Sequence, residues 1–293
     1  MTQSFPIQFI GERINPGFKS TKALFDNSDI RGIQVLAVKQ AEAGAAYLNV
    51  NTGSRALTDP GFMVEVIRAI QDVVDLPLSF DFPSAEVQRL CFQAYDPAKA
   101  RGRKAILNSI TEHRWGLSDL AREFPLRVIL MTSERVEDGA AKGNRTAEQI
   151  YGTCCRGVER LCSEYNLTPD DILLDMSVSA IIADTDGLND NTLQAMTLVY
   201  RNPALKGVHM MGGLSNIGQQ LPPRALDGSD LKHSLECAFL TVAVPRGLDT
   251  VLGTPWREYH PLAEDNYVLQ AYRTFLASRG SNALRAVRKF YRA

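Results

Sequence analysis

Residues 207–224, which read GVHMMGGLSNIGQQLPPR, decide the fold. The segment begins as a short apolar strand that we expect to break at the glycine pair Gly212 and Gly213. Polar side chains follow the pair, among them Ser215, Asn216, Gln219 and Arg224. A buried strand that ends in glycines, amides and a guanidinium is typical of the strand ends where an α/β barrel builds its site. A solvated glycine-rich turn explains this one stretch equally well, but the same pattern recurs along the chain.

The bulk properties are those of an ordinary globular protein. Of 293 residues, 45% are apolar and 22% are charged, which allows a sizeable core. The net charge of −1 predicts neither nucleic acid nor an anionic membrane as a partner. The sequence has no run of 18 apolar residues and no basic-then-apolar start. We therefore expect a cytoplasmic protein without a membrane span or a signal peptide.

Cysteine and histidine spacing predicts neither disulfides nor a metal site. The five cysteines are odd in number and form no CxxC pair: Cys91, Cys154, Cys155, Cys162 and Cys237. This usage is typical of reduced, mostly buried thiols. The four histidines are far apart and form no HxxxH or HxH pattern: His113, His209, His233 and His260. Spacing along the chain thus argues against a protein-bound zinc ion.

Short apolar runs alternate with segments of helical period throughout the chain. The predicted strands are Ile7–Ile14, Tyr47–Asn51, Leu76–Phe82, Ala105–Ile110, Arg127–Thr132, Ile172–Met176, Gly207–Met211 and Thr250–Gly253. The predicted helices are Ile30–Ala43, Gly61–Val74, Ala85–Ala94, Gly116–Glu123, Thr146–Glu164, Asn191–Arg201, Leu231–Val244 and Asn266–Ser278. Eight strands and eight helices in strict alternation predict an α/β fold, a (β/α)8 TIM barrel.

No linker or change in composition divides the chain, so we expect residues 1–293 to form one domain. An open, doubly wound sheet is the alternative architecture, but no GxGxxG motif follows the first strand. Asp59-Pro60 has the pattern of a helix N-cap followed by proline in the first turn. The basic, amphipathic segment Asn282–Tyr291 is expected to pack as a C-terminal tail.

Seven of the eight predicted strands end in polar residues, and in a barrel these ends carry the chemistry. The candidate site residues among them are Glu12, Asn15, Asn49, Asn51, Asp81, Asn108, Asp175, Ser215, Asn216 and Gln219. Amides and carboxylates dominate, which argues against nucleophilic or Schiff-base catalysis. No close carboxylate pair indicates a glycosidase. The set suits a neutral, planar ligand such as a pterin, whose adjacent N–H donors a carboxylate can bind through two parallel hydrogen bonds.

Several of these motifs together resemble one known family. They are Ile10-Gly11-Glu12-Arg13-Ile14-Asn15, Leu48-Asn49-Val50-Asn51, Phe80-Asp81, Leu107-Asn108-Ser109, Leu174-Asp175 and Gly213-Leu214-Ser215-Asn216. The chain resembles the pterin-binding methyltransferases, and more closely the methyltetrahydrofolate:corrinoid protein methyltransferases, relatives of the folate domain of cobalamin-dependent methionine synthase. The resemblance extends from about Phe9 to Thr254 and implies the barrel fold.

The resemblance also implies roles for individual residues. Asp81, Asn108 and Asp175 match the positions that hold the pterin ring, and Asn216 matches the asparagine beside N5 of the folate. The remaining implied folate-binding residues are Glu12, Asn15, Asn49, Asn51, Ser215, Gln219 and Arg224. The implied substrate is tetrahydrofolate or 5-methyltetrahydrofolate, and the implied partner is a corrinoid protein that carries the cobalamin. The family also suggests a homodimer.

Some positions depart from the family pattern. Asn49-Val50-Asn51 stands where close relatives have Asp-x-Asn, so one negative charge is missing. Phe82-Pro83 follows Asp81 where relatives often have Ser-Thr or Ser-Ser, and the last strand ends in Gly253-Thr254-Pro255-Trp256. These changes spare the ring contacts, and they leave open which corrinoid partner and which methyl donor the protein uses. They favour transfer from a methylated corrinoid protein to tetrahydrofolate.

Three other interpretations compete with this one. Dihydropteroate synthase shares the barrel, but the chain lacks its Ser-x-Arg-x-His and Thr-Pro-Asp-Ser-Phe runs. A non-catalytic folate-binding or corrinoid-docking subunit is the second alternative, although Asn216 is retained. The third is an unrelated barrel with a calcium loop at 184–191, a run that begins like an EF-hand but has Ala195 in place of the closing glutamate. An acidic strand-to-helix loop is the expected structure there.

Overall fold

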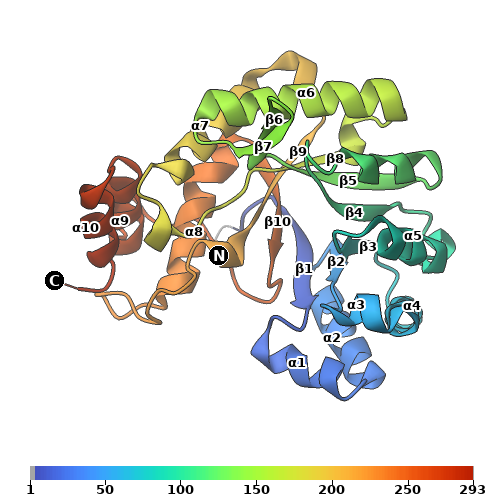
Figure 1. Cartoon of the computed structure of the whole chain (residues 1–293). Coiled ribbons are helices and arrows are strands. Elements are labelled where there is room, and N and C mark those ends of the chain that lie inside the picture. Colours follow the sequence, from blue (N-terminus) through green and yellow to red (C-terminus); the bar gives the residue numbers. More distant parts are fainter. Residues whose placement is uncertain (1–3, 293) are drawn as a thin grey trace.

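The computed structural model describes residues 4–292 and has eight parallel strands closed into a barrel (Figure 1). The strands follow one another around the barrel in the order β1-β10-β9-β8-β5-β4-β3-β2. Their bounds are β1 Gln8–Ile14, β2 Tyr47–Val50, β3 Leu78–Asp81, β4 Ala105–Ile110, β5 Leu126–Met131, β8 Ile172–Asp175, β9 His209–Gly213 and β10 Leu248–Gly253. The predicted TIM barrel is confirmed.

The glycine pair does not break its strand, because β9 continues through Gly213. A Cβ atom at Gly212 would lie 2.6 Å from Cγ2 of Val178. The glycine therefore serves close packing against the loop after β8 rather than strand termination. This expectation from the sequence was wrong for that reason.

Helices surround the barrel. The α-helices are α1 Lys19–Asp26, α2 Ile30–Glu42, α3 Arg55–Thr58, α4 Pro60–Gln71, α5 Ala85–Ala94, α6 Ala147–Tyr165, α7 Leu188–Arg201, α8 Leu231–Ala243, α9 Tyr267–Leu276 and α10 Ser281–Arg288. The predicted helix at 116–123 is instead the 3-10 helix Trp115–Arg122, since Gly116 in its first turn weakens α-helix formation. Among the described residues, no helix is both long and apolar enough to cross a membrane.

Local signals set several boundaries. Asp59 caps α4 by accepting a hydrogen bond from Phe62 N, and Pro60 occupies the first turn, as predicted. The expected acidic loop before α7 is also confirmed. Asp184 is buried in this loop, and its carboxylate accepts hydrogen bonds from the backbone N–H groups of Gly187 and Asn189. These bonds stabilise the start of α7.

One element was missed from the sequence. An antiparallel hairpin, β6 Glu134–Glu137 with β7 Ala140–Gly143, follows β5 and lies against α6 (Figure 1). Its turn residues Asp138 and Gly139 have φ values of 55° and 77°, as a two-residue Asp-Gly hairpin turn requires. That dipeptide was the available signal.

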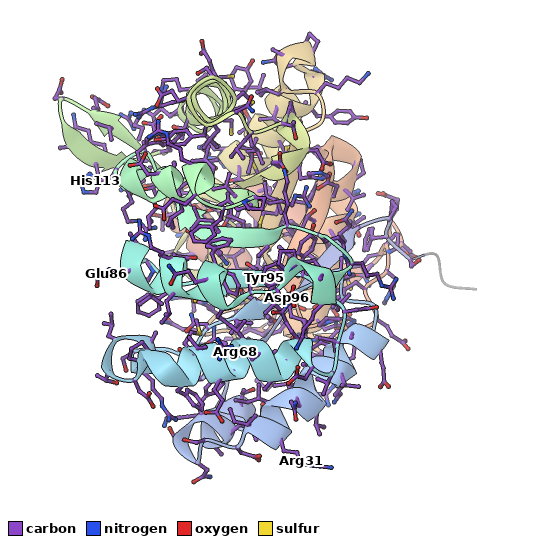
Figure 2. All side chains as sticks on the ribbon, turned by 90° about the vertical axis from the view of Figure 1, so that its right-hand side faces the viewer. Arg31, Arg68, Glu86, Tyr95, Asp96 and His113 are labelled. Carbon is purple, nitrogen blue, oxygen red and sulfur yellow. The ribbon has the colours of Figure 1, made fainter. Side chains whose placement is uncertain are left out.

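The outer helices pack in pairs. Figure 2 shows α4 and α5 side by side on one flank, with Arg68 on α4 and Glu86 near the start of α5. The end of α5 is tied to α4 because Gln71 Nε2 donates to the Asp96 carbonyl at 2.9 Å. On the opposite flank, α9 and α10 lie outside α8, so the C-terminal segment packs as predicted (Figure 1).

The barrel interior is a layer of buried side chains from six strands: Ile10, Tyr47, Ile106, Ile129, Leu173 and Met211. Towards the N-terminal ends of the strands, Arg127 Nη1 donates to the Tyr47 hydroxyl at 2.7 Å. At the same end, the His209 ring nitrogens lie 2.8 Å from Asp249 Oδ2 and 3.1 Å from Asp170 Oδ1. The hydrogen bond with Asp249 raises the pKa of His209. This end of the barrel is thus held by paired charges.

Candidate functional site

The carboxyl ends of β2, β3 and β4 bring four predicted residues together. Asp81 Oδ2 accepts hydrogen bonds from Asn49 Nδ2 at 3.2 Å and from Asn51 Nδ2 at 3.1 Å. Asn108 Nδ2 donates to Asn49 Oδ1 at 3.1 Å. Both asparagine amides donate to the same oxygen of Asp81, Oδ2. Among the described residues no side chain donates to Oδ1, so this oxygen can accept a hydrogen bond from a ligand. An oriented carboxylate with a free oxygen suits a ligand that presents N–H donors.

A buried glutamine that the sequence interpretation missed holds these strand ends. Gln88, on α5, is fully buried, and its Nε2 lies 2.7 Å from the carbonyls of Phe80 and Phe82 and 3.0 Å from that of Asn108. These carbonyls flank Asp81 and belong to the adjacent ends of β3 and β4. Gln88 is therefore a positioning residue, and a polar residue on the apolar face of a predicted helix was its signal.

Glu12 lies on β1, which pairs with both β2 and β10, and it anchors the neighbouring part of the rim. Its Oε2 accepts from Ser215 Oγ at 3.0 Å and its Oε1 from Thr254 Oγ1 at 2.9 Å. Burial raises the pKa of Glu12, and these two hydrogen bonds partly oppose that shift. A carboxylate from β1 is thus linked to Ser215, the neighbour of Asn216, through contacts that only strand closure creates.

Asp175 ends β8 between these two groups. Its Oδ1 accepts a hydrogen bond from Ser177 N at 2.8 Å, and Thr132 Oγ1 donates to its backbone carbonyl at 2.8 Å. Burial raises the pKa of Asp175 to about 6. A carboxyl group that titrates so close to neutrality is available both as an acceptor and as a donor to a bound ring.

Asn216 is exposed at the end of the short 3-10 turn Leu214–Asn216 that follows β9. Its Oδ1 accepts from Gln219 Nε2 at 2.8 Å, so the amide N–H2 of Asn216 points its donors elsewhere. Arg224 lies farther along the loop, where Nη1 donates to the Gly228 carbonyl at 3.2 Å. Asn15 Oδ1 accepts from Gly17 N at 2.8 Å and so supports its own turn. Of these four predicted residues, Asn216 and Gln219 therefore lie at the rim, whereas Arg224 and Asn15 make contacts within their own loops.

A second charged group beside Glu12 was also missed from the sequence. Arg257 Nη1 lies 3.0 Å from Glu236 Oε2, and Arg257 Nη2 lies 3.3 Å from Asp230 Oδ2. Burial raises the pKa of Glu236 to about 7, against the opposing effect of Arg257. Asp230 is the N-cap of α8, Glu236 lies on α8 and Arg257 lies in the loop after β10. They form no motif along the chain, so no signal marked them.

The strand order places these groups around one rim. The ends of β2, β3 and β4 are adjacent and carry Asn49, Asp81 and Asn108. The ends of β8, β9 and β10 are also adjacent, and β10 pairs with β1, which carries Glu12. The arrangement is a ring of amides and carboxylates at the carboxyl end of the barrel. It has the hydrogen-bonding capacity to grip a planar heterocycle by its edge.

A match to the pterin binding enzyme family covers residues 14–252, and the chain belongs to this family. Within it, the chain is 24% identical over 253 residues to the methylcorrinoid:tetrahydrofolate methyltransferase of Eubacterium limosum, a match that covers 84% of both chains. The predicted family is confirmed.

Solved structures of similar fold include dihydropteroate synthases. The enzyme of Xanthomonas albilineans with 4-aminobenzoic acid is 16% identical, with a TM-score of 0.59, and the match covers 88% of this chain and 91% of that one. The enzyme of Stenotrophomonas maltophilia is 18% identical, with a TM-score of 0.58 and coverage of 91% and 92%. At these identities the likeness supports the shared barrel fold alone.

Proposed function

We propose that this protein is a methyltransferase that moves a methyl group between N5 of tetrahydrofolate and the cobalt of a corrinoid carried by a partner protein. The observation that carries the proposal is the Asp81 carboxylate, oriented by Asn49 and Asn51 at the rim of a pterin-family barrel. The methylcorrinoid:tetrahydrofolate methyltransferase that the chain resembles over 84% of its length supports the same reaction.

In this proposal the pterin edge lies against the two carboxylates. Asp81 accepts the adjacent N–H donors of the 2-amino-4-oxo edge, and Asn108 pairs with a neighbouring ring atom. Asp175, whose pKa is about 6, binds a further polar ring atom in either protonation state. Gln88 acts through the carbonyls at the ends of β3 and β4, which it keeps at the spacing this grip requires.

Asn216 is the proposed catalytic residue. Its side-chain amide does not titrate near neutral pH, so it acts by hydrogen bonding to N5 and not by general acid catalysis. When a methyl group leaves N5, the nitrogen gains a proton; when N5 accepts the methyl, it loses one. Water near Asp81, Asn108 and Asp175 carries that proton. The corrinoid cobalt supplies the nucleophile or the methyl donor when the partner protein is bound.

The direction we favour is from a methylated corrinoid protein to tetrahydrofolate. The methyl group then leaves cobalt for N5 while N5 releases its proton, and the cobalt keeps the electron pair. The relative from Eubacterium limosum is named for transfer in this sense. The strand ends that depart from the family pattern, at Asn49, Phe82-Pro83 and Gly253–Trp256, were the sequence features that favoured it.

Partners and setting complete the proposal. We expect a cytoplasmic homodimer that binds a corrinoid protein and a folate, as the family resemblance suggests. The net charge of −1 favours neither nucleic acid nor membrane among its partners.

The decisive experiment is an absorbance assay of the purified protein. It is mixed with free cob(I)alamin and methyltetrahydrofolate, and in the reverse sense with methylcobalamin and tetrahydrofolate. Cobalamin spectra that change in either mixture support methyl transfer, and the faster direction supports the corresponding physiological sense. A protein that binds no folate in a calorimetric titration overturns the proposal. A protein that binds folate but transfers no methyl group, even with corrinoid proteins supplied, fits the binding-subunit alternative instead.

A further inference from the structure

Three potential metal ligands meet beside the last strand of the barrel. His233 and Cys237 are four residues apart on α8, where side chains share one helix face, and His260 lies in the loop after β10. Their three ligand atoms all lie within 4.8 Å of one another. His233 Nε2 is 3.8 Å from Cys237 Sγ, and the two imidazole ring centroids are 6.3 Å apart. No other such group of three occurs among the described residues.

The separation between His233 Nε2 and Cys237 Sγ fits a tetrahedral zinc ion. Bond lengths of about 2.3 Å for Zn–S and about 2.0–2.1 Å for Zn–N give a nitrogen-to-sulfur separation of about 3.6 Å at the tetrahedral angle. The observed 3.8 Å therefore needs only a small side-chain adjustment. A thiolate with two imidazoles is also a ligand set that zinc prefers, whereas magnesium and calcium prefer oxygen.

The surroundings orient the ligands. His260 Nδ1 lies 3.0 Å from the Glu258 carbonyl, an acceptor that places the ring proton on Nδ1 and leaves the lone pair of Nε2 free. Histidines that bind metals commonly donate their other N–H to such a carbonyl. Cys237 is fully buried, while His233 and His260 are partly exposed. A cavity of about 370 Å³ adjoins His260, so solvent can approach the cluster from that side.

We propose that His233, Cys237 and His260 form a zinc-binding site, with water as the fourth ligand. Binding exchanges the thiol proton of Cys237 for the metal, so one proton is released and the thiolate remains bound. The spacing of the histidines along the chain argued against a zinc site. Such spacing describes only residues that are near one another in the sequence. Strand closure brings His260 to α8, and no spacing rule describes that contact.

The site would clamp the loop after β10 to α8. This loop carries Thr254, which donates to Glu12, and Arg257, which pairs with Glu236. Zinc would thus hold one wall of the polar rim without touching the substrate. The zinc site does not depend on the proposed methyl transfer, because metal binding itself can be measured.

The test is a metal titration of the intact protein. The zinc content of protein purified without chelator is measured first. The protein is then stripped with a chelator and titrated with zinc chloride and, as a spectroscopic probe, with cobalt(II) chloride. The expected result is one ion per chain and a thiolate-to-cobalt charge-transfer band. Cys237→Ser should abolish the band, and His260→Ala should weaken binding by more than the roughly 10–100-fold cost of a lost second-shell contact.

Cys162→Ser is the matched control, because this half-buried thiol lies on α6 and outside the cluster. It should bind zinc like the unaltered protein. Since His260 lies in a loop, its alanine variant tests the site even if Cys237→Ser fails to fold. A stripped protein that takes up neither metal overturns the proposal. Binding that survives both Cys237→Ser and His260→Ala overturns it equally.

Discussion

The two ends of the barrel differ in how they hold particular carboxylates, although the carboxyl end also contains the ion pair of Arg257 with Glu236. At the N-terminal end, His209 bridges Asp249 and Asp170, so each charge has a partner. At the carboxyl end, the acceptors Asp81 and Asp175 are met by amide and backbone donors and not by cations. An ion pair made within the fold stabilises it, whereas a carboxylate held by neutral donors keeps its charge available for a ligand.

This difference teaches where function and stability reside in the same barrel. Barrel enzymes place chemistry at the carboxyl ends of their strands and stability at the other end. Here the burial that raises the pKa of Asp175 to about 6 is a cost of folding that a bound ligand can offset. Substitutions at the two ends should therefore separate activity from stability.

The largest expected effect is on the reaction itself. Asn216→Ala should lower the rate of methyl transfer by about two orders of magnitude, because it removes one oriented donor at N5. Stopped-flow absorbance of the cobalamin measures this rate. The fold should be unaffected, since Asn216 is exposed. Asn282, another exposed asparagine, lies on α10, and Asn282→Ala is the control; a similar rate for the two variants would remove Asn216 from the catalytic role.

The next substitution should stabilise the fold, whereas most substitutions destabilise it. The pKa of Asp175 is about 6 in the folded state, above its ordinary 3.8, so ionisation destabilises the fold as pH rises through this interval. The asparagine of Asp175→Asn cannot ionise, so the variant avoids this loss. The difference in unfolding free energy between the variant and the unaltered protein should increase, in favour of the variant, by up to about 3 kcal/mol from pH about 4 to pH about 7. Urea unfolding at both pH values measures it. A pH-independent difference would contradict the prediction.

A paired experiment contrasts the two ends directly. Asp81→Asn should weaken folate binding by about 10–100-fold, because the bonds it loses are made to a charged group. One acceptor for Asn49 and Asn51 remains, so the fold should be retained. Asp249→Asn at the opposite end is the control: it should leave folate affinity unchanged and lower stability. Calorimetric titration measures the affinities, and equal losses in both variants would show that the two ends do not differ in this way.

The smallest expected effect is the pH dependence of the N-terminal end. Asp249 raises the pKa of His209 above 6.5, so the contribution of the pair is complete below pH 6.5 and is lost as pH rises through the raised value. His209→Gln should therefore be most destabilising at acidic pH and progressively less so at alkaline pH. Thermal unfolding across this range measures it. The exposed His113, labelled in Figure 2, lies outside this group, so His113→Gln is the control, and the same trend in both variants would contradict the prediction.

The fold was predictable because its signals are local. Alternating apolar runs and helical segments identify eight strand–helix units, and polar residues at strand ends identify Asp81, Asn108, Asp175 and Asn216 as candidates. The hairpin after β5 was overlooked although Asp138-Gly139 marks its turn. The glycine pair in β9 was misjudged because glycine serves both turns and close packing, and only the contact with Val178 distinguishes the two.

The sequence by itself determined the barrel, the rim that carries polar groups and the family, since each depends on periodicity or on short motifs. Tertiary structure alone decided which of those groups meet. Ser215 reaches Glu12 because β9, β10 and β1 are neighbours in the closed sheet, and Gln88 reaches three carbonyls because α5 packs across β3 and β4. His260 joins His233 for the same reason. Contacts between distant segments depend on how the barrel closes, and no local pattern in the chain encodes that geometry.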